Sequence, residues 1–351
     1  MRHFGLAFMG AGLALASFSA MALFPFRQPD IPHRILDRKY SDWRSAFFAG
    51  PCGSQIHYRD EGRADGPPLV LVHGYCASLH TWEPWVERLA EHYRIVSIDL
   101  PGHGLTRTAE GYRIGRDSFA EIIDAAAEHL GLETFAIAGS SMGGAAAWDY
   151  AARRPEKVAA LVLVGAAGFT PRPEQDFGEP VVLDLLRSPM GPVLRDLDAT
   201  PMMRKGLKAS FANPAIVGDA MIERYVALGR APMHRNVQMQ LALARSERIY
   251  ATPEALARIS APTLVLHGEK DRLVPVGDGI RFATAIRDAQ LMIYEDVGHI
   301  LHEEIPEQSA EDVHAFLQGV LTGQGRLDLQ QPAEAPAREE RRAAPHLHLV
   351  A

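Results

Sequence analysis

Residues 135–153 read FAIAGSSMGGAAAWDYAAR, and this stretch decides the fold. An apolar run typical of a buried strand leads into a Gly-x-Ser-x-Gly turn and then into an alanine-rich stretch typical of a helix. The serine in such a sharp turn needs small neighbours, because other backbone comes close to it. Ser141, and not Ser140, has glycine two residues before it and two residues after it, so we predict Ser141 as a nucleophile. The alternative is a glycine-rich turn that merely buries a hydroxyl.

The predicted nucleophile requires partners, because a serine hydroxyl needs a base, and the base needs an orienting acid. We predict His299 as the base, because Gly298 permits a tight turn before it at the end of the last apolar run. His302 is the rival, and we expect it to pack or hydrogen-bond beneath His299. Asp271, which follows the apolar run 263–266, is predicted to orient the base. Its alternative role is that of a loop aspartate that caps a turn.

Acyl transfer also needs N–H donors for the oxyanion that develops in the transition state. The backbone N–H of Met142, directly after the nucleophile, is the first predicted donor. The second should come from the loop after the apolar run 69–72, where we choose Tyr75 over Cys76. The Tyr75 ring either lines an acyl pocket or covers the core, and the sequence does not decide between these two roles. Tyr75 and Ser140 are also predicted to contact the substrate.

Strand-like runs alternate with helix-like stretches from residue 55 onward. The first run, 55–59, alternates polar and apolar residues and is predicted to be an edge strand. The others resemble buried parallel strands and span 69–72, 94–98, 135–138, 160–164, 263–266 and 291–294. The helix-like stretches between them span 82–92, 117–130, 142–153, 276–286 and 306–317. This alternation predicts an α/β fold with a mostly parallel sheet and helices on both faces.

The stretch 169–260 interrupts this alternation with helix-like pieces separated by prolines. It is too long for a loop in a compact domain, so we predict a helical cap inserted after the sixth strand. The core then consists of 27–168 and 261–322. The tail 323–351 is rich in Pro, Ala, Gln, Arg and Glu and is predicted to be disordered.

The N-terminal stretch 4–26 carries no charge and is long enough to span a bilayer as a helix. Ala20-Met21-Ala22 also offers a signal-peptide cleavage site. We therefore predict that residues 1–26 are a membrane anchor or a signal peptide, with the anchor preferred. An uncleaved segment would attach the protein to a bacterial inner membrane, and a cleaved one would export it. The basic residues that follow leave the side of the membrane open.

The composition excludes several other classes of protein. Hydrophobic residues make up 47% of the chain and charged residues 23%, and the net charge is −7. A basic stripe of the kind that binds nucleic acid is missing, so we predict no nucleic-acid partner. Cys52 and Cys76 are too few for a disulfide scaffold and have no zinc spacing, so we expect free thiols, with one disulfide between them as the alternative if the domain is exported. We predict no metal and no cofactor, and the sequence does not indicate an oligomeric state.

Five motifs in order resemble those of the α/β-hydrolase fold superfamily, over roughly residues 55–321. They are His73-Gly74, the turn 99–104, the Ser141 turn, the Asp271 segment and Gly298-His299. Within the superfamily the chain is most similar to bacterial family V lipases and esterases and to meta-cleavage-product C–C hydrolases, which also carry a helical cap. The chain order of serine, aspartate and histidine is the one expected for this fold.

Two features refine this resemblance. The serine nucleophile disfavours the aspartate-dependent haloalkane dehalogenases and epoxide hydrolases. Ser140 stands where many relatives carry asparagine, which weakens assignment to any one subgroup. Asp99 and His103 are expected to be structural and to fix the turn after their strand.

The leading hypothesis is a serine hydrolase that cleaves small-molecule carboxylic esters through an acyl-enzyme. The first alternative is a C–C bond hydrolase of meta-cleavage products, which needs cations for the substrate carboxylates. Arg230 and Arg235 could supply them if their guanidinium groups pointed toward Ser141. The second alternative is a hydrolase-like scaffold that only binds a ligand, and the complete set of triad residues disfavours it.

Overall fold

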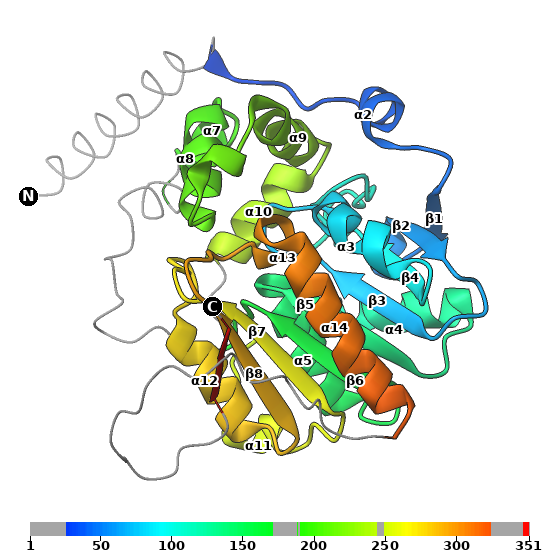
Figure 1. Cartoon of the computed structure of the whole chain (residues 1–351). Helices are drawn as coiled ribbons and strands as arrows, with labels where there is room; N and C mark the ends of the chain where they lie inside the picture. Colours follow the sequence, from blue (N-terminus) through cyan, green and yellow to red (C-terminus); the bar gives the residue numbers. More distant parts are fainter. Residues whose placement is uncertain (1–25, 171–187, 189, 244–248, 324–346, 351) are drawn as a thin grey trace, which may run out of the picture.

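A nine-stranded sheet runs through the computed structural model, which describes residues 26–170, 188, 190–243, 249–323 and 347–350 (Figure 1). The order of its strands is β1-β2-β4-β3-β5-β6-β7-β8-β9. β2 is antiparallel to both β1 and β4, and every other neighbouring pair is parallel. The strands are β1 (Ser45–Ala49), β2 (Gln55–Gly62), β3 (Pro68–Val72), β4 (Arg94–Ile98), β5 (Phe135–Ser140), β6 (Val158–Val164), β7 (Thr263–Gly268), β8 (Ala289–Tyr294) and β9 (Leu347–Val350). The predicted, mostly parallel sheet is confirmed.

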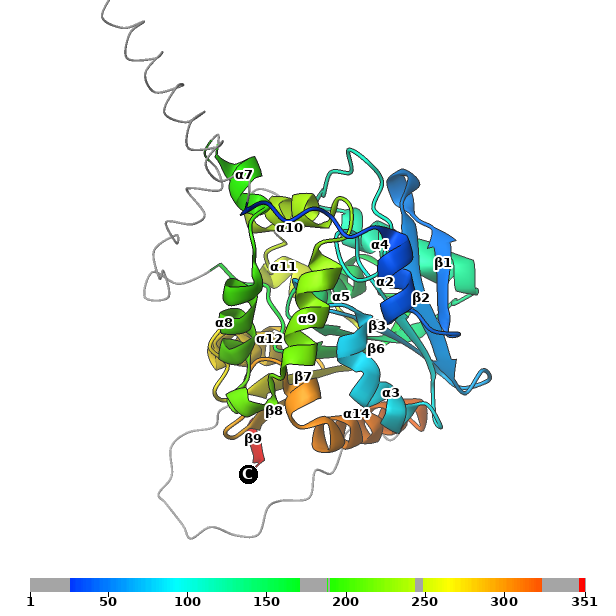
Figure 2. The same cartoon turned by 90° about the horizontal axis from the view of Figure 1, so that it is seen from above.

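Helices cover both faces of this sheet, as predicted (Figures 1 and 2). Successive side chains of a strand point to opposite faces, so a continuous apolar run feeds two cores. In β3, Leu69 and Leu71 pack in one core, whereas Val70 and Val72 pack in the other. The first core includes α3 (Glu83–Leu89) and α14 (Pro306–Leu321); the second includes α4 (Ser118–Leu130), α5 (Met142–Arg153) and α12 (Val276–Ala285).

A helical cap follows the sixth strand, as predicted. Its helices are α7 (Gly191–Arg195), α8 (Thr200–Ser210), α9 (Asp219–Gly229) and α10 (His234–Leu243). The cap contacts the loops that follow the sheet, since Gln238 donates a hydrogen bond to the carbonyl of Gly102, 3.0 Å away. Residues 171–187 of the predicted cap lie outside the described part of the chain, and the predicted domain limits remain predictions.

The stretch before β1 crosses the cap (Figure 2). Gln28 N–H donates to Asp196 O at 2.7 Å, and Ile31 N–H donates to Arg230 O at 2.8 Å. The unpredicted helix α2 (His33–Tyr40) then buries Leu36 in a cluster that includes Leu105, Leu228 and Ala231. These contacts join the N-terminal part of the described chain to both the cap and the core.

Two predictions about the strands differ from the structure. The run 55–59 is not an edge strand, because β1 pairs with its outer side and residues 56–59 are buried. The predicted disordered tail contains β9, which pairs with β8. The alternating sequence Leu-His-Leu-Val of β9 suits a strand, although proline- and alanine-rich sequence before it hid the signal. The rest of that tail, 324–346 and 351, lies outside the described residues.

Among the described residues, none of the helices is both long and apolar enough to cross a membrane. The predicted anchor or signal peptide, residues 1–26, lies outside the described part except for Phe26. The membrane attachment therefore stays a prediction.

Candidate active site

Ser141 lies in the sharp turn between β5 and α5. Its backbone has φ 53° and ψ −113°, a conformation that costs a non-glycine residue about 1–3 kcal/mol. Three backbone hydrogen bonds hold it there: its N–H donates to Val164 O at 3.0 Å, and its carbonyl accepts from Ala145 N–H and Ala167 N–H, each at 3.0 Å. This strained turn places the serine at the carboxyl edge of the sheet, as the Gly-x-Ser-x-Gly pattern predicts.

The glycines around Ser141 are required by close backbone contacts. A Cβ at Gly143 would lie 2.1 Å from Val72 O and 2.5 Å from His73 O. A Cβ at Gly139 would lie 2.1 Å from Gly143 O. Since these neighbours are backbone atoms of β3, of the loop after it and of α5, they cannot move aside cheaply, and no side chain fits at either position.

We expect Gly143→Ala to lower the free energy of unfolding by about 1–3 kcal/mol, because the added methyl overlaps fixed backbone. Gly206→Ala is the matched control, since Gly206 lies in the exposed middle of α8 with nothing within 4 Å of an added Cβ. The control should gain roughly 0.5–1 kcal/mol of helix propensity. Urea unfolding of both variants measures the effect. Equal stability of the two would contradict the steric argument.

Asp271 and His299 form a buried pair after β7 and β8. His299 Nδ1–H donates to Asp271 Oδ2 at 2.6 Å. The other oxygen, Asp271 Oδ1, accepts the N–H groups of Leu273 and Val274, both at 2.8 Å. With Nδ1 as the donor, the neutral His299 ring leaves Nε2 unprotonated and able to accept a proton. The structure thus joins the predicted acid to the predicted base.

The pKa of Asp271 lies below its ordinary value. Burial alone would raise this pKa, but His299 and the nearby His267 outweigh it by stabilising the carboxylate. His267 Nε2 lies 3.4 Å from Asp271 Oδ2 and 2.9 Å from Val274 O. The carboxylate therefore stays ionised at neutral pH and stabilises an imidazolium at His299 when one forms.

Gly165, directly after β6, brings this pair next to the serine turn. A Cβ at Gly165 would lie 3.2 Å from His299 Nδ1 and 3.3 Å from Asp271 Oδ2. The preceding residue, Val164, accepts the hydrogen bond from the Ser141 N–H. Among the described residues no hydrogen bond joins Ser141 Oγ to His299. Hydrogen bonds between a nucleophile and its base are often long without substrate and shorten in the complex. The three predicted residues thus meet at one edge of the sheet.

His302, the rival of His299, lies beneath the site. Its ring stacks on Trp82 with the centroids 4.3 Å apart, and Nε2 lies 2.8 Å from Thr81 Oγ1. Burial, with a smaller contribution from His299, lowers the pKa of His302 to about 3. A ring so enclosed packs rather than exchanges protons with a substrate, as expected.

The loop after β3 lies against the serine turn and carries the predicted oxyanion donor Tyr75. A Cβ at Gly74 would lie 3.3 Å from both Ser140 O and Ser141 Cβ. His73 Nδ1–H donates to Gly74 O at 2.7 Å, and its Nε2 accepts Leu100 N–H at 3.1 Å. Because the C=O and N–H of a trans peptide point in opposite directions, His73 fixes the direction of the Tyr75 N–H. Sequence reasoning assigned His73 to a motif but missed this role.

The remaining predicted residues of the site differ in exposure. Tyr75 is 43% exposed, and its hydroxyl donates to Gln238 O of the cap at 2.9 Å. Ser140 is buried at the end of β5, and Met142 begins α5 directly after the serine. Burial raises the pKa of the Cys76 thiol to about 12, so this free cysteine stays protonated.

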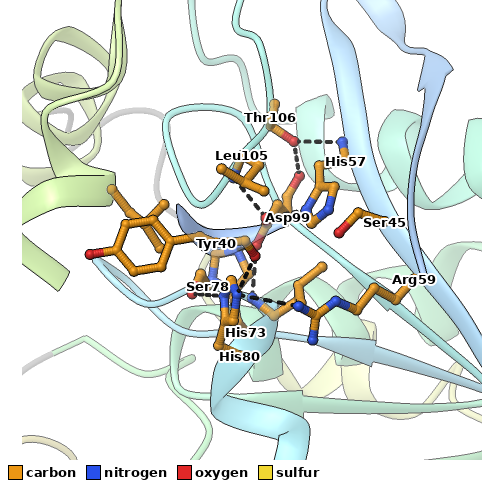
Figure 3. A network of polar contacts seen from close by, with 12 residues as sticks. Tyr40, Ser45, His57, Arg59, His73, Ser78, His80, Asp99, Leu105 and Thr106 are labelled. Carbon is orange, nitrogen blue, oxygen red and sulfur yellow. Dashed lines mark hydrogen bonds and ion pairs between the residues drawn. The ribbon is translucent and has the colours of Figure 1, made fainter. Parts of the chain in front are cut away.

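Asp99 anchors a buried polar network beneath the same loop (Figure 3). Its Oδ1 accepts Leu79 N–H at 2.7 Å, and its Oδ2 accepts Leu105 N–H at 2.9 Å and lies 2.7 Å from His57 Nδ1. Burial opposes ionisation, but His57 and other nearby histidines keep the pKa of Asp99 below its ordinary value. A Cβ at Gly104 would overlap the carboxylate. Asp99 thus fixes its turn and the loop after β3, as expected of a structural residue.

His103 is buried in that turn, and its Nδ1 lies 3.0 Å from Pro101 O. Burial lowers its pKa well below the ordinary value, so it is neutral at physiological pH. This contact accounts for His103 as a structural residue.

Arg230 and Arg235 bind the N-terminal stretch. Arg230 Nη2 donates to Pro29 O at 2.8 Å, and Arg235 Nη2 donates to Asp30 Oδ1 at 2.6 Å. The structure therefore does not bring these guanidinium groups to Ser141.

This fold and this site define an α/β hydrolase, and the family comparison agrees. The family model described as alpha/beta hydrolase fold matches residues 67–306, well over half of the chain. The protein therefore belongs to the α/β-hydrolase family.

The relatives include a protein named for an ester substrate and a protein named for a dienoate substrate. A pimeloyl-(acyl-carrier protein) methyl ester esterase of Nitrosomonas europaea is 28% identical over 73% of this chain and 96% of its own. A 2-hydroxy-6-oxo-2,4-heptadienoate hydrolase of Pseudomonas putida is 27% identical over 70% of this chain and 87% of its own. The crystal structure of a membrane phospholipase A, a bacterial virulence factor, is 28% identical with a TM-score of 0.67, covering 92% of this chain and 99% of its own.

Proposed function

We propose that this protein hydrolyses carboxylic esters through a covalent acyl-enzyme on Ser141. The observation that carries the proposal is the Asp271–His299 pair, with His299 Nδ1 and Asp271 Oδ2 2.6 Å apart beside the strained serine turn. An oriented base next to a serine held at positive φ is the arrangement that activates a hydroxyl.

In the first half of the proposed reaction, Ser141 Oγ attacks the acyl carbon while His299 Nε2 takes the hydroxyl proton. The carbonyl oxygen becomes an oxyanion, which the N–H groups of Tyr75 and Met142 stabilise. Collapse of the tetrahedral intermediate breaks the acyl–oxygen bond, and His299 returns the proton to the leaving alcohol. In the second half, a water molecule attacks the acyl carbon while His299 Nε2 removes its proton. Collapse of the second tetrahedral intermediate breaks the bond from the acyl carbon to Ser141 Oγ, and His299 returns the proton to Oγ as the acid is released.

The proposed substrates are esters with a lipophilic acyl chain. This choice of substrate assumes that residues 4–26 attach the protein to a membrane, and that attachment is also part of the proposal. The name of one relative, a membrane phospholipase A, supports the membrane attachment. The name of another, a methyl ester esterase, supports the ester bond. The hydrogen bond from the Tyr75 hydroxyl to Gln238 O joins the loop after β3 to the cap, which supports an acyl site between the two.

C–C bond hydrolysis is the second candidate, because the Pseudomonas putida relative at 27% identity is named for such a substrate. Those substrates carry carboxylates and need cations in the pocket. Arg230 and Arg235, the cap residues proposed for this role, bind Pro29 and Asp30 instead. This geometry favours the ester.

The test is hydrolysis of p-nitrophenyl esters from acetate to palmitate by the full chain in detergent, beside a vinylogous 2-hydroxy-6-oxo-dienoate. We expect turnover of the esters with a preference for longer acyl chains, because a longer chain held against the cap removes more apolar surface from water. Cleavage of the dienoate without turnover of any ester would replace the ester proposal with the C–C alternative.

A further inference from the structure

The carboxylate of Glu304 lies between the cap and the loop of the predicted base. Glu304 Oε2 accepts Gly298 N–H at 2.7 Å, from the residue directly before His299. The same carboxylate accepts two N–H groups of the chain that leaves the cap helix α8: Ala212 N–H at 3.2 Å and Asn213 N–H at 2.7 Å. One side chain thus ties together two segments that lie more than 80 residues apart in the sequence.

A second set of contacts joins the same two segments. Ser210, the last residue of α8, accepts His299 N–H at 2.7 Å and Ile300 N–H at 3.3 Å on its carbonyl. A Cβ at Gly298 would lie 2.6 Å from Ala212 N and 2.7 Å from Ser210 O, so the two backbones touch. Three consecutive N–H groups, from residues 298 to 300, are therefore engaged either by Glu304 or by the cap.

The cap side of this junction is anchored. Phe211, between Ser210 and Ala212, is 1% exposed and packs in a cluster with Leu207, Val217, Ile222 and Tyr225, against which Ile300 also packs. The end of α8 cannot shift without disturbing both this cluster and the His299 backbone. A carboxylate acceptor makes stronger hydrogen bonds to these N–H groups than a neutral acceptor would.

We propose that Glu304 is a positioning residue that couples the cap to the catalytic base. This inference rests on the proposed function, because it assigns His299 the role of base. Glu304 fixes the start of the His299 turn relative to α8, so the ring keeps the register that proton transfer from Ser141 requires. Because α8 belongs to the cap, the position of the cap also sets the position of the base. Movement of the α8 end would move His299 with it.

The test compares Glu304→Ala, Glu304→Gln and the control Glu307→Ala in the full chain. Glu307 lies three residues further on, at the start of α14, but its side chain is 69% exposed and pairs with Arg88. Turnover of p-nitrophenyl butyrate is normalised to active sites by titration. We expect kcat of Glu304→Ala to fall about 10- to 100-fold with KM changed less than about threefold, because small misplacement of a base costs rate.

Glu304→Gln should be milder, with a loss of only a few-fold, since its single oxygen can still accept the Gly298 and Ala212 N–H groups. It also serves as the folded variant if the alanine substitution prevents folding. Glu307→Ala should keep wild-type kcat. A kcat of Glu304→Ala within threefold of wild type, per titrated site in a folded protein, would overturn the proposal.

Hydrogen exchange provides a readout that does not depend on ester turnover. In both Glu304 variants we expect faster exchange in peptides that contain residues 210–213 and in those that contain 298–300. Faster exchange at 210–213 alone would show that Glu304 braces the cap without positioning His299, which also overturns the proposal. If the wild type hydrolyses no ester, the proposed function fails, whereas loosening of both segments would still support the coupling.

Discussion

Replacing Ser141 with alanine is expected to lower kcat for ester hydrolysis about 10⁵- to 10⁶-fold, with the fold unchanged. The hydroxyl is the atom that becomes acylated, and loss of it leaves only substrate binding and the oxyanion donors. Alanine suits the turn no worse than serine, because the backbone bonds to Val164, Ala145 and Ala167 involve main-chain atoms alone. Stability should therefore change by less than about 0.5 kcal/mol.

The measurement is turnover of p-nitrophenyl butyrate together with labelling by a fluorophosphonate probe that reacts with activated serines. Ser309→Ala is the matched control, since Ser309 is a buried serine on α14 that accepts a hydrogen bond from Trp85 Nε1 at 2.9 Å. The control should lose stability but retain both labelling and kcat. Probe attachment to Ser141→Ala, or turnover above about 1% of wild type, would exclude Ser141 as the nucleophile.

Asp271→Asn is expected to lower kcat about 10⁴-fold, because it reverses the tautomer of His299. The amide oxygen of the new side chain should occupy the place of Oδ1, where Leu273 N–H and Val274 N–H each donate at 2.8 Å. Its NH₂ group then faces His299 and donates to Nδ1. The ring must carry its proton on Nε2, where it can no longer accept one from Ser141.

The tautomer can be read directly from ¹⁵N chemical shifts of the His299 ring, which distinguish a protonated Nδ1 from a protonated Nε2. Asp278→Asn is the control, because Asp278 lies on α12 and pairs with Arg281 at 3.2 Å, away from the triad. It should keep wild-type kcat. A proton that remains on Nδ1 in Asp271→Asn, together with normal kcat, would show that Asp271 does not orient the base.

The same substitution changes how stability depends on pH. The pKa of folded Asp271 lies below its ordinary value of about 3.9, so the ionised group stabilises the fold above that value. This contribution is lost as the pH falls through the folded pKa. The difference in unfolding free energy between wild type and Asp271→Asn should therefore be constant above about pH 5 and shrink below it. A difference that grows on acidification would contradict the direction of the pKa shift.

Those parts of the fold that repeat a local pattern could be predicted from the sequence. The helix 142–153 has the bounds expected of it, and the parallel strands follow from apolar runs that feed a core on each face. The short strand β1 could not be predicted, because its apolar sequence does not alternate and it gains order by pairing with β2. The helix α2 is likewise stabilised by one buried residue, Leu36, on a distant surface.

The candidate site shows the same division. Ser141 and His299 lie in tight turns that need glycine at fixed distances from them in the sequence, so a single sequence reveals them. Residues that act through long-range contacts leave none: Glu304 contacts Asn213 across 91 positions, and His57 contacts Asp99 across 42. Their partners are backbone groups and buried carboxylates whose positions depend on the whole fold, so a single sequence gives no signal for them.

The segment that crosses the cap also has a consequence for the order of assembly. Arg27 bonds to Asp196, 169 residues later in the chain. At a synthesis rate of 5–20 residues per second, this segment leaves the ribosome roughly 10 to 30 s before its partner exists. Leu36 stays without its neighbours Leu228 and Ala231 for still longer. The part of the described chain that is made first must therefore wait for cap residues that are made much later, and a nascent chain would need protection there.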